Sequence, residues 1–386
     1  MEEKRKYRVF ISAAEPSADA YCASLIAALK QADRDIEFAG VGGEKMEQAG
    51  CTLLEKTADK AVMAHNAIGQ AGRFYFLLRR INAFLKNNRT DLVVVCDSPA
   101  FNFHVAKAAK KLGAKVLFYV APQLWAWAEW RINKLRKWCD KLCCILPFEQ
   151  EWFAQRGIEA VFVGHPLLGE QAEDLAGGQK RYAGFDPKNV SIALMPGSRQ
   201  AEINTLWRPM QQIAVRIRRR FANATFTAAT VDEKMKDALR SMQVVGFRCK
   251  YATGSLAEVA RSVDFSIVAS GTATLQVAAA GCPMAVMYQS SRILWHILGR
   301  WLIKTKYLSL VNILAGKELV PEFMPYFSSI EPIAGTIEGL LQDTNRLVQT
   351  SDELIRLTQP LMQGRASQKV AEIVNDMLHN PAFGGQ

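Results

Sequence analysis

The sequence predicts an α/β protein with two doubly wound, parallel-sheet domains that face each other across a cleft. In both halves of the 386-residue chain, continuous apolar strands alternate with amphipathic helices, a pattern typical of a parallel sheet covered on both faces. A polar, glycine-bearing stretch separates the two halves. In the second half, two strands each end in a small-residue turn that opens a helix, and such a turn offers backbone N–H groups to an anion.

The alternation predicts strands and helices over most of the first half. The strands are expected at residues 9–13, 37–40, 92–96, 116–120 and 141–146, and the helices at 18–31, 72–87, 103–112 and 129–138. Beyond the polar stretch, a second alternation is expected with strands at 191–195, 224–229, 265–268 and 284–288. We therefore expect domains over 1–168 and 190–360, a linker over 169–189, and a helical segment over 361–386 that can return to the first domain.

The charge of the chain indicates which partners it favours. A formal net charge of +11 suits phosphates, anionic lipid or nucleic acid. Cations accompany bulky apolar residues at 73–81 and 292–307, which suits an anionic membrane surface better than a nucleic-acid groove. In the second stretch the pattern consists of Trp295, Arg300, Trp301, Lys304 and Lys306. The alternative is a core-facing stripe with a solvated basic edge. We expect a membrane surface as a partner, no nucleic acid, and leave the oligomeric state open.

The first residues lack the apolar length and the cleavage site of a secretory signal, and no stretch reaches the roughly 18–20 apolar residues of a spanning helix. We therefore expect a cytoplasmic protein that associates peripherally with a membrane. The eight cysteines lie mostly in apolar runs, as Cys96 and Cys143 do, which is typical of reduced core thiols. Cys139 lies close to Cys143 but without a CxxC pair or a nearby histidine, so no metal site is expected.

Two turns in the second half are typical of phosphate-binding turns. The first follows the strand at 191–195 and adds Arg199, whose planar guanidinium can hold two phosphate oxygens at once. The second follows the strand at 265–268 and carries hydroxyl groups on a glycine-bearing turn; its candidate ligands are Ser270, Gly271, Thr272 and Thr274. Neither turn fits the dinucleotide glycine fingerprint or the phosphate loop with its lysine. The pattern favours a nucleotide diphosphate on a different doubly wound scaffold.

Acidic residues follow two strands of the first half. Glu15 and Asp19 flank the start of a helix, and the alternative for Asp19 and for the neighbouring Ser17 is helix capping. Asp97 follows the strand at 92–96, where its carboxylate can serve as the general base for an acceptor hydroxyl. The alternative for Asp97 is a turn-capping role.

A series of motifs carries a family resemblance. In chain order they are Tyr119-Val-Ala-Pro-Gln-Leu-Trp-Ala-Trp, Leu146-Pro-Phe-Glu, Phe162-Val-Gly-His-Pro-Leu, Leu194-Met-Pro-Gly-Ser-Arg, Ser270-Gly-Thr-Ala-Thr-Leu, and Asn312-Ile-Leu-Ala-Gly with Val320-Pro-Glu. This ordered set closely resembles lipid-A-disaccharide synthase, a glycosyltransferase family of the GT-B type with two Rossmann-like domains. The resemblance covers nearly the whole chain, from Ile11 to about Glu322.

The resemblance implies transfer of 2,3-diacylglucosamine from its UDP form to the 6-hydroxyl of 2,3-diacylglucosamine 1-phosphate. The products would be UDP and a β-1,6-linked disaccharide 1-phosphate, formed by inversion without a covalent intermediate, at the cytoplasmic face of the inner membrane. Asp97 matches the family's strand-end aspartate and would be the base, with Glu15 as a second catalytic candidate. Arg199 and the helix opening at Ser270 would neutralise the departing UDP. No metal and no cofactor are expected.

The resemblance also extends the candidate binding site. Ser17, Gln276, Asn312 and Glu322 match family positions that contact the substrates, with Gln276 replacing a glutamate. His165 would contact the donor sugar or phosphate, and the alternative is a packing role where the two domains join. Trp125 and Trp127 would border an acyl-chain groove or, in the alternative, lie in the core.

The sequence departs from the family pattern at several site motifs. Alanine replaces glycine at Ala14 and Ala18, Ala100 replaces a second aspartate, Gln276 replaces glutamate, and Pro325 stands where a glutamine is expected. These changes imply a divergent member with altered substrates or reduced activity. The alternative functions are another UDP-sugar transferase or epimerase on the same fold, or a catalytically impaired UDP-sugar-binding relative.

Overall fold

A computed structural model describes residues 6–32, 35–57, 67–170, 172, 182, 184–292, 295–296 and 304–380. The chain divides into two compact units, hereafter unit 1 and unit 2. Unit 1 comprises Met1–Glu170 and Gln363–Gln386, and unit 2 comprises Gln171–Met362. Most of the stretch expected as a linker, residues 169–189, lies outside the described residues. The prediction of two parallel-sheet α/β domains is confirmed by the strand pairings of both units.

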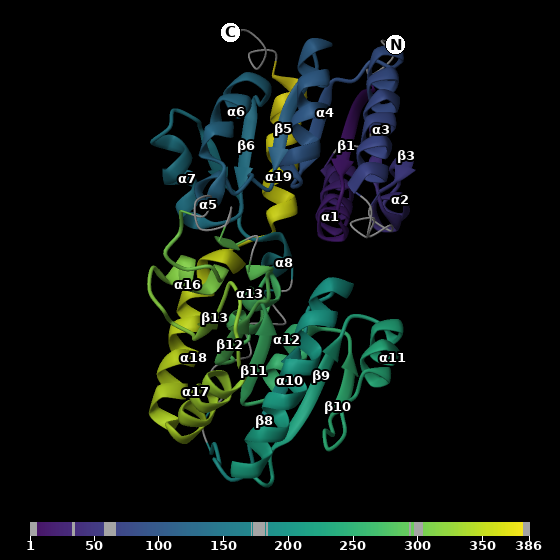
Figure 1. Cartoon of the computed structure of the whole chain (residues 1–386). Coiled ribbons are helices and arrows are strands. Elements are labelled where there is room, and N and C mark those ends of the chain that lie inside the picture. The colour runs from purple at the N-terminus through teal and green to yellow at the C-terminus, as the bar shows by residue number, and fades with distance from the viewer. Residues whose placement is uncertain are drawn as a thin grey trace. The chain divides into compact units, whose positions relative to one another are not determined.

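Unit 1 contains a seven-stranded sheet in the order β3-β2-β1-β4-β5-β6-β7, with every pairing parallel. The strands are β1 (Tyr7–Ala13), β2 (Ile36–Gly42), β3 (Thr52–Lys56), β4 (Leu92–Cys96), β5 (Lys115–Tyr119), β6 (Lys141–Cys144) and β7 (Ala160–Phe162). The helices are α1 (Pro16–Ala32), α2 (Glu44–Gln48), α3 (Ala67–Asn87), α4 (Pro99–Lys111), α5 (Leu124–Trp127), the 3-10 helix η1 (Glu129–Arg131), α6 (Ile132–Trp138), α7 (Pro147–Ala154), α8 (Pro166–Gly169) and α19 (Ala366–His379) (Figure 1).

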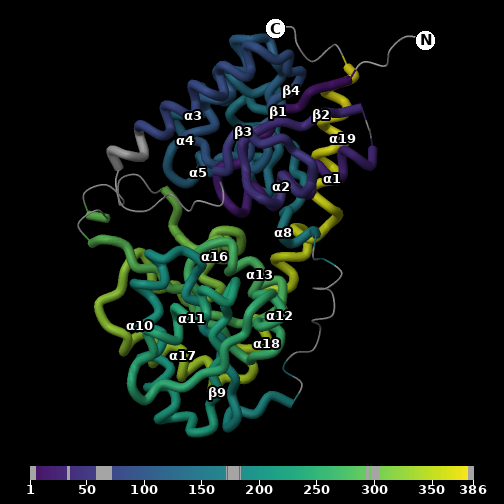
Figure 2. The backbone as a smooth tube through the Cα atoms, turned by 90° about the vertical axis from the view of Figure 1, so that its right-hand side faces the viewer, coloured from purple at the N-terminus to yellow at the C-terminus, as the bar shows by residue number. Residues whose placement is uncertain are grey.

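The sheet of unit 1 is buried around its central strand β4, which is apolar at every position. All five residues of β4 are buried, so both faces of this strand must be covered by helices. On one face, Leu77, Ile81 and Leu85 of α3 recur every four residues and pack into the core with Phe10 and Phe118. The C-terminal helix α19 lies beside α1 although the two are far apart in sequence (Figure 2).

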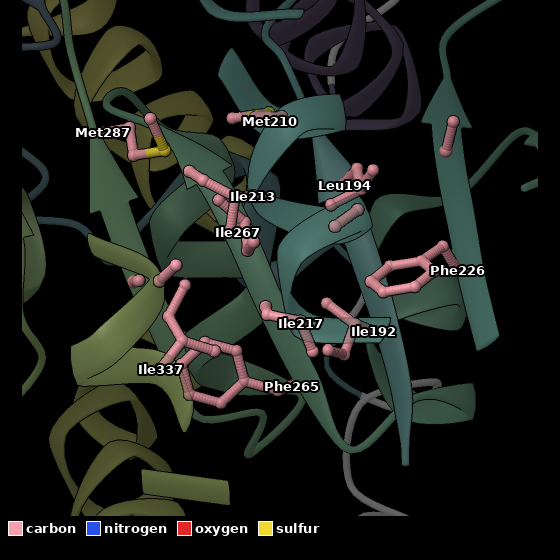
Figure 3. Close-up of a cluster of buried hydrophobic side chains, with 14 of the residues drawn as sticks. Ile192, Leu194, Met210, Ile213, Ile217, Phe226, Phe265, Ile267, Met287 and Ile337 are labelled. Atoms are coloured by element: carbon pink, nitrogen blue, oxygen red, sulfur yellow. The ribbon is translucent and has the colours of Figure 1, made fainter. Parts of the chain in front are cut away.

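Unit 2 contains a six-stranded parallel sheet in the order β10-β9-β8-β11-β12-β13. The strands are β8 (Ser191–Met195), β9 (Thr225–Thr230), β10 (Lys250–Thr253), β11 (Phe265–Ala269), β12 (Met284–Met287) and β13 (Glu322–Phe323). The helices are α10 (Gln200–Arg220), α11 (Glu233–Ser241), α12 (Leu256–Ser262), α13 (Ala273–Ala279), α16 (Leu310–Ala315), α17 (Glu331–Gln342), α18 (Thr344–Thr358) and the 3-10 helix η3 (Gln359–Met362). Figure 3 shows part of its core, where Ile213 and Ile217 of α10 pack with Ile267 of β11 and Ile337 of α17.

Several predicted elements of unit 1 differ from the structure in their bounds. Helix α3 begins at Ala67 rather than at residue 72. Helix α4 begins at Pro99 rather than at residue 103, because proline suits the first helical position, where no N–H is needed. The helix expected at 129–138 is a 3-10 turn followed by α6. The strand expected at 141–146 ends at Cys144, because Leu146 already caps α7.

None of the helices in the described ranges combines the length and the apolar character needed to cross a bilayer. All eight cysteines are free thiols, and six of them are buried.

Candidate active site

Each sheet has one point at which the strand order reverses direction. In unit 1 the reversal lies between β1 and β4, and in unit 2 between β8 and β11. Ligands of open α/β sheets bind at the carboxyl ends of the strands that flank such a point. Glu15 and Asp97 follow β1 and β4, while Arg199 and Ser270 follow β8 and β11. The predicted residues therefore flank the reversal point of their own sheet in each unit.

The turn after β4 holds Asp97 in an unusual backbone conformation. Asp97 and Ser98 both have positive φ angles, 54° and 41°, in the left-handed region that residues with a Cβ rarely adopt. The N–H of Asp97 donates to the carbonyl of Tyr119 at 3.2 Å, which ties the turn to the end of β5. The Ser98 hydroxyl donates to Oε1 of Glu15 at 3.3 Å. Asp97 and Glu15 are half-buried and come from neighbouring loops, so the structure brings the two catalytic candidates to one place.

Ser17 and Asp19 have different surroundings in α1. Ser17 is half-buried, and its hydroxyl has no hydrogen-bond partner among the described residues. Asp19 is buried and accepts the N–H groups of Gly43 at 2.7 Å and Met46 at 3.1 Å, at the start of α2. The capping interpretation of Asp19 was wrong in its target, because the carboxylate caps the neighbouring helix α2 and not its own.

His165 is buried at the N-cap position, directly before α8 in unit 1. Its ring lies edge-on to that of Tyr21, with centroids 6.5 Å apart, and its Nδ1 atom has no hydrogen-bond partner in the structure. Burial lowers the pKa of His165 to about 4, so the imidazole is neutral near pH 7. A neutral, enclosed imidazole fits the packing interpretation of this residue. Burial, followed by the proximity of Cys96 and Asp97, raises the pKa of Tyr21.

Two of the sequence motifs meet through Trp125 and Glu149. The indole Nε1 of Trp125 donates to Oε1 of Glu149 at 2.9 Å, and Oε2 accepts the N–H groups of Ile145 at 3.2 Å and Leu146 at 3.0 Å. Both side chains are buried, and burial raises the pKa of Glu149 to about 7. Trp125 is therefore a core residue, whereas 42% of Trp127 is exposed.

The first anion turn of unit 2 is partly occupied by an acidic side chain of its own helix. Glu202 accepts the backbone N–H of Arg199 at 3.3 Å and its Nη1 at 3.1 Å. Gly197 has a φ of +96°, and a Cβ there would collide with the Glu202 carboxylate. The Arg199 side chain is 68% exposed. A phosphate that binds at this turn would therefore compete with the Glu202 carboxylate for the Arg199 guanidinium.

The residues of the second turn, at the start of α13 in unit 2, differ in whether their side chains are already hydrogen-bonded. Ser270 donates its N–H to Met287 at 2.9 Å, which fixes the turn against β12. Thr274 is buried and its hydroxyl donates to the carbonyl of Gly271 at 2.7 Å, so it shapes the turn. The hydroxyls of Ser270 and Thr272 and the side-chain amide of Gln276 have no hydrogen-bond partners among the described residues.

Asn312 and Glu322 are joined to each other. Asn312 is buried, and its Nδ2 donates to the carbonyl of Val320 at 2.8 Å and to Oε2 of Glu322 at 3.0 Å. Its Oδ1 accepts two backbone N–H groups, those of Leu319 and Val320. Glu322 also accepts the N–H of Ser309 at 3.0 Å, at the start of α16. Because Asn312 uses all of its donors and acceptors in this way, it positions Glu322 and the loop before β13.

The positions that depart from the family pattern lie in different environments. Ala18 is buried in α1, whereas Ala100 is exposed in the first turn of α4. Ala14 is half-buried and packs against the core of unit 1. The carbonyl of Pro325 accepts both the N–H and the hydroxyl of Ser290, at 2.9 and 2.8 Å, which ties it to the loop after β12.

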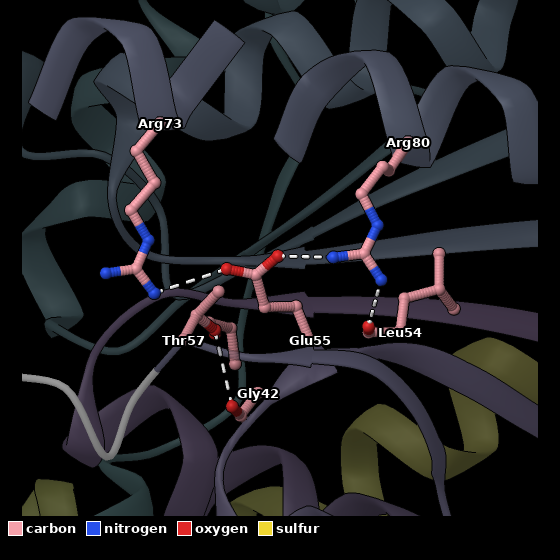
Figure 4. A network of polar contacts seen from close by, with 7 residues as sticks. Gly42, Leu54, Glu55, Thr57, Arg73 and Arg80 are labelled. Carbon is pink, nitrogen blue, oxygen red and sulfur yellow. Dashed lines mark hydrogen bonds and ion pairs between the residues drawn. The ribbon is translucent and has the colours of Figure 1, made fainter. Parts of the chain in front are cut away.

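Two cations in the basic and aromatic stretch of α3 are paired with an acidic side chain. Arg73 and Arg80 pair with the two carboxylate oxygens of Glu55 on β3, at 3.2 and 2.6 Å (Figure 4). Arg80 also donates to the carbonyl of Leu54 at 2.7 Å. Between these cations Tyr75 is 63% exposed, and its neighbours Phe74 and Phe76 are exposed as well. The aromatic residues of this stretch thus face solvent, while two of its cations attach α3 to the sheet.

The second basic and aromatic stretch is only partly described. Trp295 is half-buried, and Lys304 and Lys306 are exposed, whereas Arg300 and Trp301 lie outside the described residues. In the part of the chain that the structure describes, no group of three or more His, Cys, Asp or Glu side chains could hold a metal ion. The metal-free reaction stays a prediction.

Sequence-based reasoning missed Asn102, whose amide donates to the carbonyls of Cys96 and Asp97, and Ser12, whose hydroxyl donates to Asn102. The available signal was a buried-type amide four residues after Ser98, within the apolar face of α4. It also missed the role of Glu149, although a glutamate three residues after an N-cap residue can accept the N-cap backbone N–H, as Glu149 does for Leu146.

Comparisons with known proteins point to one family. The lipid-A-disaccharide synthetase family model matches residues 9–376. The lipid-A-disaccharide synthase of Syntrophus aciditrophicus is 34% identical over 369 residues, which cover 94% of this chain and 96% of that protein. The enzyme of the same name from Geobacter metallireducens is 31% identical over 374 residues, which cover 96% and 97%.

Two solved structures share the fold at low sequence identity. UDP-GlcNAc 2-epimerase from Neisseria meningitidis bound to UDP-GlcNAc has a TM-score of 0.62 and 11% identity, covering 96% of this chain and 100% of that chain. The calicheamicin glycosyltransferase CalG4 has a TM-score of 0.62 and 14% identity, covering 98% and 100%. At these identities the likeness is one of fold.

Proposed function

The chain belongs to the lipid-A-disaccharide synthetase family and is a glycosyltransferase, and from this premise we propose its reaction and the residues that perform it. The donor is 2,3-diacylglucosamine in its UDP form, and the acceptor is 2,3-diacylglucosamine 1-phosphate. The acceptor 6-hydroxyl oxygen attacks the anomeric carbon as the bond to UDP breaks, and its proton passes to a protein base. The products are a β-1,6-linked disaccharide 1-phosphate and UDP.

The observation that carries the proposal is the placement of Asp97 and Glu15 at the reversal point of unit 1. Asp97 is assigned as the general base, because it directly follows the central strand β4 and is half-buried near a second acid, Glu15. Glu15 accepts the hydroxyl of Ser98 and so shares the same turn. Ser17, whose hydroxyl has no partner among the described residues, is assigned to the acceptor. Unit 1 is thus the acceptor domain in this proposal.

Unit 2 is assigned to the UDP moiety. The negative charge that develops on the departing diphosphate is stabilised by Arg199 and by the turn at Ser270–Thr272. Gln276, one turn into α13, is assigned to the ribose. Asn312 and Glu322 are assigned a supporting role, because their hydrogen bonds hold the loop before β13. Asn312 makes no direct contact with UDP in this proposal. The reaction needs no cofactor, and the diphosphate charge is met by these protein groups without a metal ion.

The membrane surface is assigned as the site of action, on the cytoplasmic side of the inner membrane. Both proposed substrates carry acyl chains, and α3 exposes Phe74, Tyr75 and Phe76. Trp130 is 65% exposed, and the guanidinium of Arg131 lies 4.9 Å from its ring centroid, a pairing that suits the interface of an anionic bilayer. Co-sedimentation with anionic vesicles that weakens as salt rises would support this assignment, and equal binding to neutral and anionic vesicles at all salt concentrations would overturn it.

The experiment that tests the function compares UDP binding with turnover in one preparation. The transferase proposal expects UDP to bind and the UDP-sugar to be consumed only when the acceptor is present. Conversion of the UDP-sugar without acceptor would indicate an epimerase. Binding without consumption under any condition would indicate a catalytically impaired relative, as the substitutions at Ala14, Ala18, Ala100, Gln276 and Pro325 allow.

A further inference from the structure

The turn that presents Asp97 is conformationally unfavourable, so some part of the fold must hold it. Asp97 and Ser98 are consecutive residues with a Cβ and φ angles of 54° and 41°. Such conformations persist only when the surrounding structure fixes them, and they concentrate at functional sites. The Asp97 carboxylate is therefore held in position only if the surrounding fold holds this turn.

One buried side chain contacts both carbonyl groups that enter the turn. The Nδ2 group of Asn102 donates to the carbonyl of Cys96 at 2.9 Å and to that of Asp97 at 2.7 Å. The Asn102 side chain is fully buried, and its backbone N–H donates to the carbonyl of Ser98 at 3.0 Å as α4 begins. The amide has two N–H donors, and both are used on the turn.

A second side chain holds the Asn102 amide from the side opposite the turn. The hydroxyl of Ser12, in the middle of the buried sheet, donates to Oδ1 of Asn102 at 2.7 Å. The two backbone carbonyls fix the amide orientation, because the reverse orientation would place Oδ1 against the carbonyl oxygens of Cys96 and Asp97. The Ser12 hydroxyl then supplies the donor that Oδ1 needs. Ser12 lies on β1, which pairs with β4 directly, so the two central strands and α4 all meet at this amide.

We propose that Asn102, held in place by Ser12, is a positioning residue that holds the left-handed turn at Asp97 and thereby aims the Asp97 carboxylate at the acceptor hydroxyl. The inference rests on the proposed role of Asp97 as general base. It adds that the rate of transfer depends on a side chain that does not touch the substrate, because a general base must lie within hydrogen-bond reach of the proton that it takes.

Two substitutions at Asn102 test the proposal. Asn102→Ala removes all three side-chain bonds, and Asn102→Asp keeps the size but places an acceptor opposite the two carbonyl oxygens. We expect kcat to fall about 10- to 100-fold in each, the range typical when a supporting partner of a site residue is lost, while KM for the acceptor stays within about twofold. The UDP dissociation constant should not change, because UDP is assigned to unit 2.

Val105→Ala supplies the matched control. Val105 is fully buried in the same helix, and its truncation weakens the packing of α4 without removing a bond to the turn. Thermal unfolding of both variants shows whether they lose similar stability. A loss of kcat in Val105→Ala equal to that in Asn102→Ala would overturn the proposal, since it would trace the effect to packing.

The decisive readout is a double-mutant cycle with Asp97→Asn. If Asn102 acts through Asp97, then Asn102→Ala should lower the residual rate of Asp97→Asn by less than about threefold. A full 10- to 100-fold loss in that background, or no loss in the wild-type background, would overturn the positioning role. Unchanged turnover in the single variant Asp97→Asn would instead refute Asp97 as the base, so the two failures are distinguishable. Should Asn102→Ala not fold, Ser12→Ala provides the same cycle, because it removes only the bond that holds the Asn102 amide oxygen.

Discussion

The hydroxyl of Ser98 lies 3.3 Å from Oε1 of Glu15 and donates to it, which joins the loop after β4 to the loop after β1. These are the two strands between which the strand order of unit 1 reverses. The contact places a second carboxylate, that of Glu15, beside the turn that carries Asp97. This turn lies at the carboxyl ends of the strands, where open α/β folds bind ligands.

Asp97→Asn should abolish most transfer while leaving nucleotide binding intact. The amide keeps the shape of the carboxylate but cannot accept the acceptor proton, and loss of a general base typically lowers the rate about 10²- to 10⁴-fold. Initial rates of UDP release and calorimetric titration with UDP measure the two effects. Turnover like that of the wild type would remove Asp97 from the mechanism.

Arg199→Lys should weaken UDP binding by about tenfold, because lysine keeps the charge but loses the two-pronged contact with phosphate oxygens. Calorimetry on purified protein gives the dissociation constant. Glu202→Gln is the matched variant: since Glu202 holds the Arg199 guanidinium at 3.1 Å, neutralising it should tighten UDP binding. An unchanged constant in Arg199→Lys would place the diphosphate elsewhere.

Gln276→Glu should tighten UDP binding by up to about tenfold. Hydrogen bonds to a charged acceptor contribute roughly 1.5–3 kcal/mol against about 1 kcal/mol for neutral pairs, and a carboxylate offers two acceptor oxygens to the ribose hydroxyls. Calorimetric titration with UDP at neutral pH measures the dissociation constant. Weaker binding in the glutamate variant would show that the native amide donates to the ligand, and that the pocket serves a different donor.

Glu149 should give unit 1 a pH-dependent stability. Burial raises the pKa of this carboxyl from 4.5 to about 7, so the folded state holds a proton that the unfolded chain releases above about pH 4.5. This contribution favours folding at low pH and is lost as pH rises from about 4.5 to about 7. His165, whose pKa burial lowers to about 4, has the opposite slope between its folded value and 6.5.

Comparison with Glu149→Gln isolates this contribution, because glutamine cannot ionise while His165 remains. The unfolding midpoint in urea should be measured for both proteins between pH 5 and 8. The stability of the wild type relative to the variant should fall as pH rises to about 7 and then level off. A difference that does not vary with pH would contradict a protonated, buried Glu149.

The strands that the sequence did not reveal are the four at the edges of the two sheets, β3, β7, β10 and β13. These strands are short and half-exposed, so they lack the continuous apolar runs that predict the central strands. The central strands β4 and β8 were predicted with the bounds that the structure gives, because every or nearly every residue in them is buried.

For the candidate site, too, some features could be predicted from the sequence and others could not. The strand-end positions of Glu15 and Asp97 follow from a parallel sheet and could be predicted from sequence. The hydrogen bonds that each polar side chain makes could not be predicted, because they depend on segments that meet only in the folded protein. Thr274 donates to its own turn, and Asn312 is saturated by the backbone before β13. Asn102 was missed for the same reason, since its partner Ser12 lies 90 residues away in sequence.

The most direct test of the proposed reaction is product analysis after incubation with UDP-2,3-diacylglucosamine and 2,3-diacylglucosamine 1-phosphate. Mass spectrometry and the one-bond carbon–proton coupling at the new anomeric centre identify the product and its linkage. We predict one β-1,6-linked tetraacyl disaccharide 1-phosphate for each UDP released, with no UDP released when the acceptor is omitted. An α linkage would contradict inversion with Asp97 as the base, and UDP binding without any disaccharide would contradict the assignment of this chain as an active transferase.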